Sequence, residues 1–410
     1  MGYCKASRRG TGEDGLYVTS STRAPVEPTA VAPASSTPSV VQAGEVRSSR
    51  IESLRAVAAL SVFVGHVWLF SHVIAGPFGL QGTLLRRMLL GGGLGVQLFF
   101  ALSGYLIYRP FARRDFGNAR SDVDLAVYTR NRAVRILPLY WAAVVILLLF
   151  TQHGGTANQW WRFLTFSENY SLTTAQTVDG PMWSLVIEVQ FYIVLPLLAW
   201  ALAKASRRSV LGATAILLAL GAASGAFWFL QLRPSFIYQY SFPATFYGFI
   251  PGMVAALLQG PLQQRRPWPW AERLLQRDLW LVCGIVLWIA TCWRLTWEPP
   301  LISAASFLVV GAVVLPLRGG RLLRALDFRP LALLGIASYS LYIWHVPILN
   351  QFVPADFHVS MWWLAAAGLP ACVAAAALSY AFIERPGLKL RGIWASSRPT
   401  RQPAPAALPS

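Results

Sequence analysis

The sequence predicts an all-α integral membrane protein with about ten transmembrane helices. Of its 410 residues, 55% are hydrophobic and only 13% are charged, and the mean hydropathy is +0.48. Soluble domains carry about 25% charged residues. A deficit of this size, together with 17 Trp residues that favour membrane–water interfaces, indicates that lipid rather than water surrounds much of the surface.

Long apolar segments follow one another along most of the chain. A helix needs about 20 apolar residues to cross the hydrocarbon core, which is about 30 Å thick. Because lipid offers no hydrogen bonds to an open backbone, we expect these segments to be helical. The ten predicted spans are 54–74, 89–108, 133–151, 183–203, 210–230, 238–258, 279–294, 300–317, 331–351 and 361–383. The seventh and eighth are the weakest, and a re-entrant pair around Pro299 and Pro300 is the alternative.

The basic residues are distributed unevenly between the loops on the two sides of this layout. The chain has 35 Lys and Arg residues and a net charge of +18. With the N-terminus in the cytoplasm, the loops on the outer side hold only Arg86, Arg87, Arg162, Arg233 and Arg294. Cytoplasmic loops are enriched in Lys and Arg. The distribution therefore predicts that both termini are cytoplasmic, and it accounts for the net charge without a nucleic-acid partner.

The two ends of the chain differ in composition from the apolar part. Residues 1–50 are rich in Ser, Thr, Pro, Ala and Gly, which predicts a disordered cytoplasmic tail. They lack the apolar region of a signal peptide, so we expect the first span to be retained. We predict one transmembrane domain over 51–386 and a second disordered cytoplasmic tail over 387–410. The four cysteines form no Cys/His cluster, so we predict no metal site.

The first span carries two ionisable residues, Arg55 and His66. They are eleven residues apart, so at about 100° per residue they point the same way, with a rise of about 16 Å between them. Arg55 would lie at the cytoplasmic mouth and His66 near the midplane. A cytoplasmic anion held by Arg55 could then extend its reactive end toward His66. The alternative is a snorkelling arginine and a histidine that hydrogen-bonds to a neighbouring helix.

The second span contains a run of glycines and other small residues that ends at Gly104. Small residues let helices approach each other closely, and helix packing is the favoured interpretation of this run. Gln97 and Ser103 are possible polar linings of a cavity.

Arg132 and Arg135 precede the third span and share one helix face. The guanidinium fork donates two parallel hydrogen bonds, which suits phosphate. The pair could bind a phosphorylated cofactor, and ordinary anchoring at the cytoplasmic surface is the alternative.

Glu188 and His345 are the remaining ionisable candidates inside spans. We expect the other acidic residues in the tail, in the loops or at span ends, so Glu188 is the one carboxylate well inside the membrane. Such a group needs a partner, and we expect a histidine or an arginine. His345 lies in the ninth span at a comparable depth. The serine and tyrosines that precede it could line a polar cavity or serve packing.

Six segments together resemble the acyltransferase-3 family of integral membrane acyltransferases. They are Arg55-x10-His66, Gly95-Val-x-Leu-Phe-Phe-x-Leu-Ser-Gly104, Arg132/Arg135-Ile-x-Pro-x-Tyr140, Trp183-Ser-Leu-x-x-Glu188, Gly335-x-x-Ser-Tyr-x-Leu-Tyr-x-x-His345 and Glu384-Arg-Pro. They occur in order over nearly the whole chain outside the tails. The resemblance implies a ten-helix core in a bacterial plasma membrane. It also implies acyl transfer from acyl-CoA to a hydroxyl of a carbohydrate or glycosylated acceptor, such as an envelope polysaccharide or a macrolide. This chain would be a version without an esterase-like domain.

This resemblance fits the placement of the candidate residues. Arg55, Arg132 and Arg135 would bind the anionic acyl-CoA. His66 would be the catalytic base or a transient nucleophile. Glu188 would orient or charge-balance an imidazole, and His345 is a second candidate base.

Two other classes of protein compete with the enzyme. Buried His and Glu also form proton relays, so a proton-coupled secondary transporter is the first alternative, although no internal repeat is evident. A non-catalytic membrane scaffold or receptor is the second. Within the enzyme hypothesis, the side from which the acceptor enters is left open. The loop over 152–182 holds Trp160, Trp161, Asn169 and Tyr170, which could contact sugar rings or form an interfacial belt.

Overall fold

The computed structural model describes residues 40–71, 88, 95–117, 122–230, 236–264, 269–293, 298–353 and 359–389. Over these ranges the protein is built from helices, and no β-strand is present apart from one isolated bridge. Five of the described helices are long and apolar enough to cross a membrane. The number rises to seven if each of two bent helix pairs is one span. The protein is therefore a multi-pass, all-α membrane protein, whereas ten crossings stay a prediction.

Each of the ten predicted segments coincides with all or part of a helix. The main helices are α1 (Val40–Ser71), α3 (Gly95–Phe116), α4 (Leu125–Phe150), α6 (Trp183–Ala205), α7 (Val210–Phe229), α10 (Ile250–Gln264), α12 (Arg277–Trp293), α13 (Glu298–Val314), α15 (Ser338–Leu349) and α16 (Met361–Ser379). Shorter elements are α5 (Ala157–Leu164), η3 (Glu168–Tyr170), η4 (Gly180–Met182), α8 (Phe236–Gln239), α9 (Phe242–Thr245), η5 (Phe246–Gly248), α11 (Pro269–Leu274), η7 (Leu322–Asp327), α14 (Arg329–Ile336), η8 (Asn350–Phe352) and η9 (Tyr380–Glu384).

Two of the predicted spans are bent rather than straight. The sixth is formed by 242–248 and α10, which meet at 43°, and the ninth by α14 with 338–352, which meet at 75°. The predicted seventh and eighth spans correspond to α12 and α13, which pack closely against each other and have 17 residues each. A crossing takes about 17–25 residues. These two helices are therefore at the lower limit of the length that a full crossing needs.

The predicted tails fall mostly outside the described residues, which begin at Val40 and end at 389. The helix α1 already begins at Val40, so its first turns occupy the end of the segment predicted as a tail. The helical region at the other end continues past α16 through the π-helical turn η9. The last eleven residues of the predicted tail over 1–50, from Val40 to Arg50, are thus helical.

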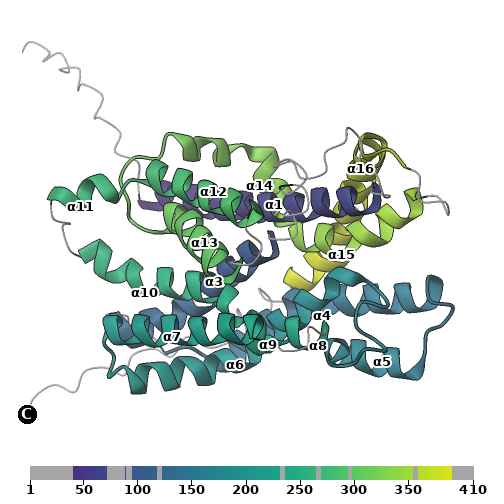
Figure 1. Cartoon of the computed structure of the whole chain (residues 1–410), viewed down its shortest axis with the longest axis horizontal. Helices are drawn as coiled ribbons and strands as arrows, with labels where there is room; N and C mark the ends of the chain where they lie inside the picture. Colours follow the sequence, from purple (N-terminus) through teal and green to yellow (C-terminus); the bar gives the residue numbers. More distant parts are fainter. Residues whose placement is uncertain are drawn as a thin grey trace, which may run out of the picture.

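The helix α3 lies at the centre of the bundle (Figure 1), where it packs against α1, α6, α10 and α13. Its contact with α10 depends on two glycines. A Cβ atom at Gly252 would lie 1.8 Å from the carbonyl oxygen of Ala101, and one at Gly104 would lie 2.2 Å from that of Phe249. No side chain fits at such distances, so glycine is required for the close approach of the two helices. Gly104, at the end of the glycine-rich run, therefore serves the close packing of these helices.

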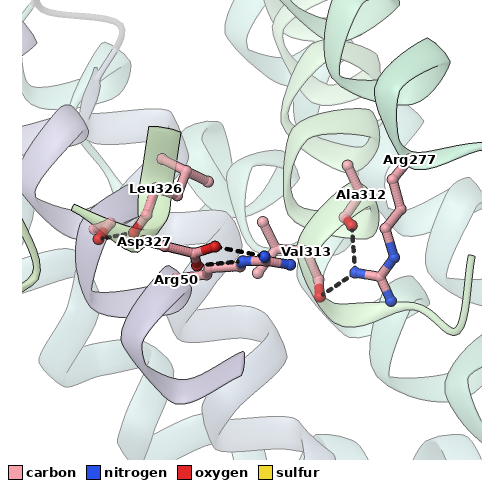
Figure 2. Close-up of polar contacts among 7 residues, drawn as sticks. Arg50, Arg277, Ala312, Val313, Leu326 and Asp327 are labelled. Atoms are coloured by element: carbon pink, nitrogen blue, oxygen red, sulfur yellow. Dashed lines mark hydrogen bonds and ion pairs between the residues drawn. The ribbon is translucent and has the colours of Figure 1, made fainter. Parts of the chain in front are cut away.

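Arginine contacts fix the ends of several helices at one side of the bundle (Figure 2). The guanidinium of Arg50 forms an ion pair of 2.6 Å with Asp327. Arg277, at the start of α12, donates hydrogen bonds to four carbonyl oxygens at and after the end of α13. The last carbonyls of a helix have no partner within the helix and carry partial negative charge. Arg277 therefore satisfies the end of α13 and holds α12 and α13 together.

Candidate active site

A cavity of about 80 Å³ lies between α1, α3, α4, α6 and α15. Its polar lining consists of Arg55, Ser103, Arg132, Arg135, Ser184, Glu188, Tyr192, Ser338, Tyr339 and Tyr342. Four of the residues singled out from the sequence therefore meet here, namely the three arginines and Glu188. Ser103, a possible cavity lining in the sequence, is also among them.

The arginines reach the cavity from two helices. Arg132 and Arg135 lie one turn apart on α4, as their spacing predicts, and Arg55 comes from α1. The guanidinium of Arg132 lies over the ring of Tyr192 at 5.9 Å, and its buried Nε has no hydrogen-bond partner. Arg55 is 3.7 Å from Glu52, a loose ion pair. The guanidiniums of Arg55 and Arg132 are thus only partly satisfied within the protein.

Arg135 is held firmly, because it forms an ion pair of 2.6 Å with Glu384. The carboxylate of Glu384 is 1% exposed, and its other oxygen accepts a hydrogen bond of 3.0 Å from Ser340. The ring of Tyr339 lies 5.8 Å from the same guanidinium. Glu384 belongs to the Glu-Arg-Pro motif, and the sequence analysis did not single it out as a site residue.

Glu188 has hydroxyl partners, whereas an imidazole or guanidinium was expected. Ser103 donates a hydrogen bond of 2.5 Å to its Oε1, and Tyr192, one turn along α6, donates to the same oxygen. The side chain faces α3 and the arginine-lined cavity, and its hydrogen bonds include none to a histidine. Glu188 lacks the expected partner because of the face of α6 on which it lies. The neighbours of that face depend on how α6 packs, which the sequence of α6 alone does not specify.

His66 and His345 form a pair with each other. Nδ1 of His66 lies 3.3 Å from Nε2 of His345 and 2.9 Å from the carbonyl oxygen of Val62. Nδ1 of His345 lies 2.6 Å from the carbonyl oxygen of Tyr342. A carbonyl only accepts, so both Nδ1 atoms carry hydrogen and Nε2 of His345 accepts. The hydrogen-bond pattern therefore leaves Nε2 of His66 unprotonated, with its lone pair free.

Tyr342 connects the histidine pair to the cavity. Its ring lines the cavity and lies 5.6 Å from the ring of His345. Its hydroxyl lies 2.7 Å from that of Ser184 and donates to the carbonyl oxygen of Pro181 at 3.1 Å. Neither histidine lines the cavity itself. The predicted site residues thus form two adjacent groups, with Tyr342 between them.

Three other carboxylates are more buried than Glu188, which was expected to be the one carboxylate well inside a span. They are Glu384, Glu168 and Asp179, with 1–3% of each residue exposed, whereas Glu188 is half-buried. Glu168 and Asp179 belong to the connection between α4 and α6, which was predicted as an outer loop. That connection folds into the bundle, where Tyr140 donates a hydrogen bond of 2.8 Å to Glu168. A local segment carries no signal for this, because the burial comes from contacts with distant helices.

The residues of this connection that were named as possible sugar contacts make contacts within the protein. Trp160 donates a hydrogen bond to the carbonyl of Gly154, and Asn169 donates to the carbonyls of Trp183 and Tyr240. Trp161 is 50% exposed and lies against Arg162. Over the described ranges, no group of three His, Cys, Asp or Glu side chains could hold a metal ion.

A family model described as an acyltransferase domain matches residues 48–381. Three proteins illustrate the similarity. Nodulation protein 10 of Rhizobium leguminosarum bv. viciae is 25% identical over 84% of this chain and 94% of its own length. The putative peptidoglycan O-acetyltransferase YrhL of Bacillus subtilis is 28% identical over 85% of this chain. The O-acetyltransferase OatA of Staphylococcus aureus is 23% identical over 82% of this chain.

The chain spans about half of the length of the two O-acetyltransferases, since the match covers 56% of each. No solved structure matches the chain.

Proposed function

The chain belongs to the acyltransferase domain family, and from this premise we propose that it transfers an acyl group from acyl-CoA to a hydroxyl of a carbohydrate or glycosylated acceptor. The observation that carries the proposal is the meeting of Arg55, Arg132 and Arg135 at one cavity inside a membrane protein. Two of its relatives are named O-acetyltransferases, which supports an acetyl or similar acyl group and a hydroxyl acceptor.

Arginine is suited to the donor because acyl-CoA is rich in phosphate. A guanidinium gives two parallel charged hydrogen bonds to phosphate, and a buried donor without a partner is costly. The Nε of Arg132 is such a donor. Arg55 and Arg132 would bind the phosphates directly, and Arg135 would add positive charge from its fixed position beside Glu384. Glu188 would balance the charge of the three arginines. It would also hold the Ser103 and Tyr192 hydroxyls in place, because it accepts a hydrogen bond from each.

His66 is the proposed catalytic base. Its free Nε2 would take the proton of the acceptor hydroxyl as the acceptor oxygen attacks the thioester carbonyl. The carbon–sulfur bond then breaks, and the CoA thiolate takes the proton from the imidazolium. Arg55 and His66 lie on one helix with a rise of about 16 Å between them. The extended pantetheine arm would therefore run from the arginines past Tyr342 to His66.

His345 is proposed to position His66 rather than to act as a second base. Its Nδ1 is bound to the backbone, so its Nε2 can only accept, and it accepts from Nδ1 of His66. The single hydrogen on Nδ1 of His66 would be shared between the carbonyl oxygen of Val62 and Nε2 of His345, which keeps Nε2 of His66 free, and both contacts strengthen as positive charge develops on His66. A covalent acyl-imidazole at the same Nε2 is the variant of this mechanism in which His66 is the nucleophile.

The proposed surroundings follow from the same family membership. The residues over 51–386 would form the transmembrane domain of a multi-pass protein of the bacterial plasma membrane, with both termini in the cytoplasm. The arginines lie toward the Leu125 end of α4, which then faces the cytoplasm, where acyl-CoA is made.

The test is CoA release by the purified full chain in lipid nanodiscs, with and without a panel of glycosides. His66→Asn keeps a donor at the place of Nδ1 but deletes Nε2, and His153→Asn is the matched control on an exposed histidine. We expect acceptor-dependent CoA release in the wild type and the control, and its loss in His66→Asn. Full activity of a folded His66→Asn protein would refute the role of Nε2. A folded wild type that binds no acyl-CoA would refute the proposed function.

A further inference from the structure

Four buried acceptor oxygens in the connection between α4 and α6 have no hydrogen-bond partner. They are Oε2 of Glu168, Oδ1 of Asn169 and both carboxyl oxygens of Asp179. All three residues are at most 3% exposed. Buried polar groups are almost always paired, and each one left unpaired costs about 1–3 kcal/mol. Several unpaired polar oxygens in one short connection therefore indicate a place for hydrogen-bonding groups from outside the chain.

From this cluster we propose that Glu168, Asn169 and Asp179 form the subsite for the acceptor, a hydroxyl-rich molecule that enters from the Phe150 end of α4. The inference rests on the proposed function and adds to it the residues that bind the acceptor and the side from which it comes.

The contacts of the connection link the subsite through Pro181 and Tyr342 to the histidine pair. Glu168 is fixed by Tyr140, and Phe166 stacks on the Tyr140 ring at 4.2 Å. Asp179 lies two residues before Pro181, whose carbonyl accepts from Tyr342. Tyr342 in turn lies against His345. An acceptor bound to Asp179 would thus have a hydroxyl close to the proposed catalytic group.

The side of entry follows from the path of the connection. It leaves α4 at its Phe150 end and reaches Tyr140, about 15 Å inside that end at 1.5 Å per residue. Arg132 and Arg135 lie on the other half of α4, which is a candidate membrane span. The donor and the acceptor would therefore reach the histidines from opposite sides of the membrane.

The chemistry of the subsite favours hydroxyl groups over a cation. No Lys or Arg forms an ion pair with Glu168 or Asp179 among the described residues. Burial raises the pKa of Glu168 to about 8 and that of Asp179 well above its usual range. Glu168 is then mainly neutral near pH 7, and burial likewise favours the neutral form of Asp179. A neutral carboxyl donates and accepts, as neighbouring sugar hydroxyls do, whereas a bound cation would favour the ionised form.

The side chain of Asn169 has a fixed orientation in this subsite. Its amide nitrogen donates to the carbonyls of Trp183 and Tyr240, at 2.9 and 3.0 Å. Both donors of the amide are thereby used, so its oxygen is left to accept from a ligand. Asn169 thus binds the backbone of Trp183, whose ring lies 4.5 Å from that of Tyr240 and provides a fluorescent probe in this part of the chain.

The test compares Asp179→Leu with the wild type, because leucine has a similar shape and no polar atom. A carboxyl that serves only a ligand is replaced without loss of thermal stability, whereas one with a structural partner is not. We expect an unchanged or higher midpoint of thermal unfolding and a rise of at least tenfold in KM for the glycoside. The KM for acyl-CoA should not change. The control is Asp122→Asn, which changes an exposed carboxylate outside the connection between α4 and α6.

Two further readouts separate this inference from the proposed function. Glycosides of the panel should change the tryptophan fluorescence of the wild type, and the change should be lost in Asp179→Leu. An unchanged glycoside KM, a lower unfolding midpoint, or a wild type that binds none of the glycosides would overturn the subsite. If the subsite is overturned but acyl-CoA still binds and turns over, the proposed function stands without this subsite. If acyl-CoA does not bind to the wild type, the function itself fails.

Discussion

The ion pair between Arg135 and Glu384 permits a test that separates stability from donor binding. Nη1 of Arg135 lies 2.6 Å from Oε2 of Glu384, and the two side chains are 17% and 1% exposed. Removal of one partner from a buried pair costs about 3–5 kcal/mol, because the other charge is left without compensation. Arg135→Met, which keeps the apolar stem, should therefore lower the free energy of unfolding by about this amount.

A second substitution should restore most of that loss. Glu384→Gln removes the uncompensated charge but still offers an oxygen to Ser340, whose hydroxyl donates to this residue. The double variant Arg135→Met/Glu384→Gln should then be only about 1 kcal/mol less stable than the wild type. The interaction energy follows from the full set of single and double variants, since the two residues are in direct contact.

Donor binding should not be restored in the same way. If Arg135 contributes charge to the phosphates of acyl-CoA without a direct hydrogen bond, loss of an electrostatic contribution of about 1.4 kcal/mol lowers the affinity about tenfold. The double variant keeps that defect, because it still lacks the guanidinium. Thermal unfolding in detergent gives the stability of each variant, and equilibrium binding of acyl-CoA in nanodiscs gives the affinity.

Two results would refute this reasoning. Wild-type affinity for acyl-CoA in the double variant would mean that Arg135 serves only as the counterion of Glu384. A single Arg135→Met variant as stable as the wild type would mean that the pair is not the buried contact described here.

Three further changes test the fold and the connection. Gly252→Ala should lower the midpoint of thermal unfolding, because its Cβ would lie 1.8 Å from the carbonyl of Ala101, whereas Gly260→Ala, which meets no atom within 4 Å, should not. Arg277→Met should lower the free energy of unfolding by on the order of 2 kcal/mol, because it leaves carbonyls at the end of α13 without their donor. Unfolding by a denaturing detergent measures this loss. The pKa of Glu168 is raised by burial to about 8, against about 4.3 in an exposed glutamate, so the folded state holds the extra proton and stability falls as pH rises between these values. Glu168→Gln should flatten that fall in unfolding midpoints measured from pH 5 to pH 8.

The helices were predictable because their signal is local. A run of about 20 apolar residues specifies a helix wherever it occurs in a membrane, so all ten predicted segments contain helix. The bend of 75° after Ile336 was not predictable, because the serines and tyrosine that follow it were equally compatible with a polar face of a straight helix. Beside the bend, α14 packs against α1, and a Cβ atom at Gly335 would meet the backbone of Glu52.

The site was predictable in its members but less so in their partners. Charged and polar residues inside apolar segments are costly, which singled out Arg55, His66, Glu188 and His345. The pairing of His66 with His345 joins residues 279 positions apart, and no spacing rule covers such a distance. The burial of Glu168 was missed for the same reason, since it depends on contact with Tyr140 across the bundle.

The start of α6 explains why one short motif matters to both halves of the site. Ser184, Glu188 and Tyr192 are four residues apart, so they lie on one face of the helix, and all three line the cavity. Ser184 contacts Tyr342, which separates the cavity from the histidine pair. Asp179, one turn before Ser184, carries the unpaired oxygens of the proposed acceptor subsite. The proposed acceptor subsite and the wall of the proposed donor cavity thus belong to the same helix end. If binding of one substrate shifts this helix end and changes the affinity for the other, the reverse effect has the same factor.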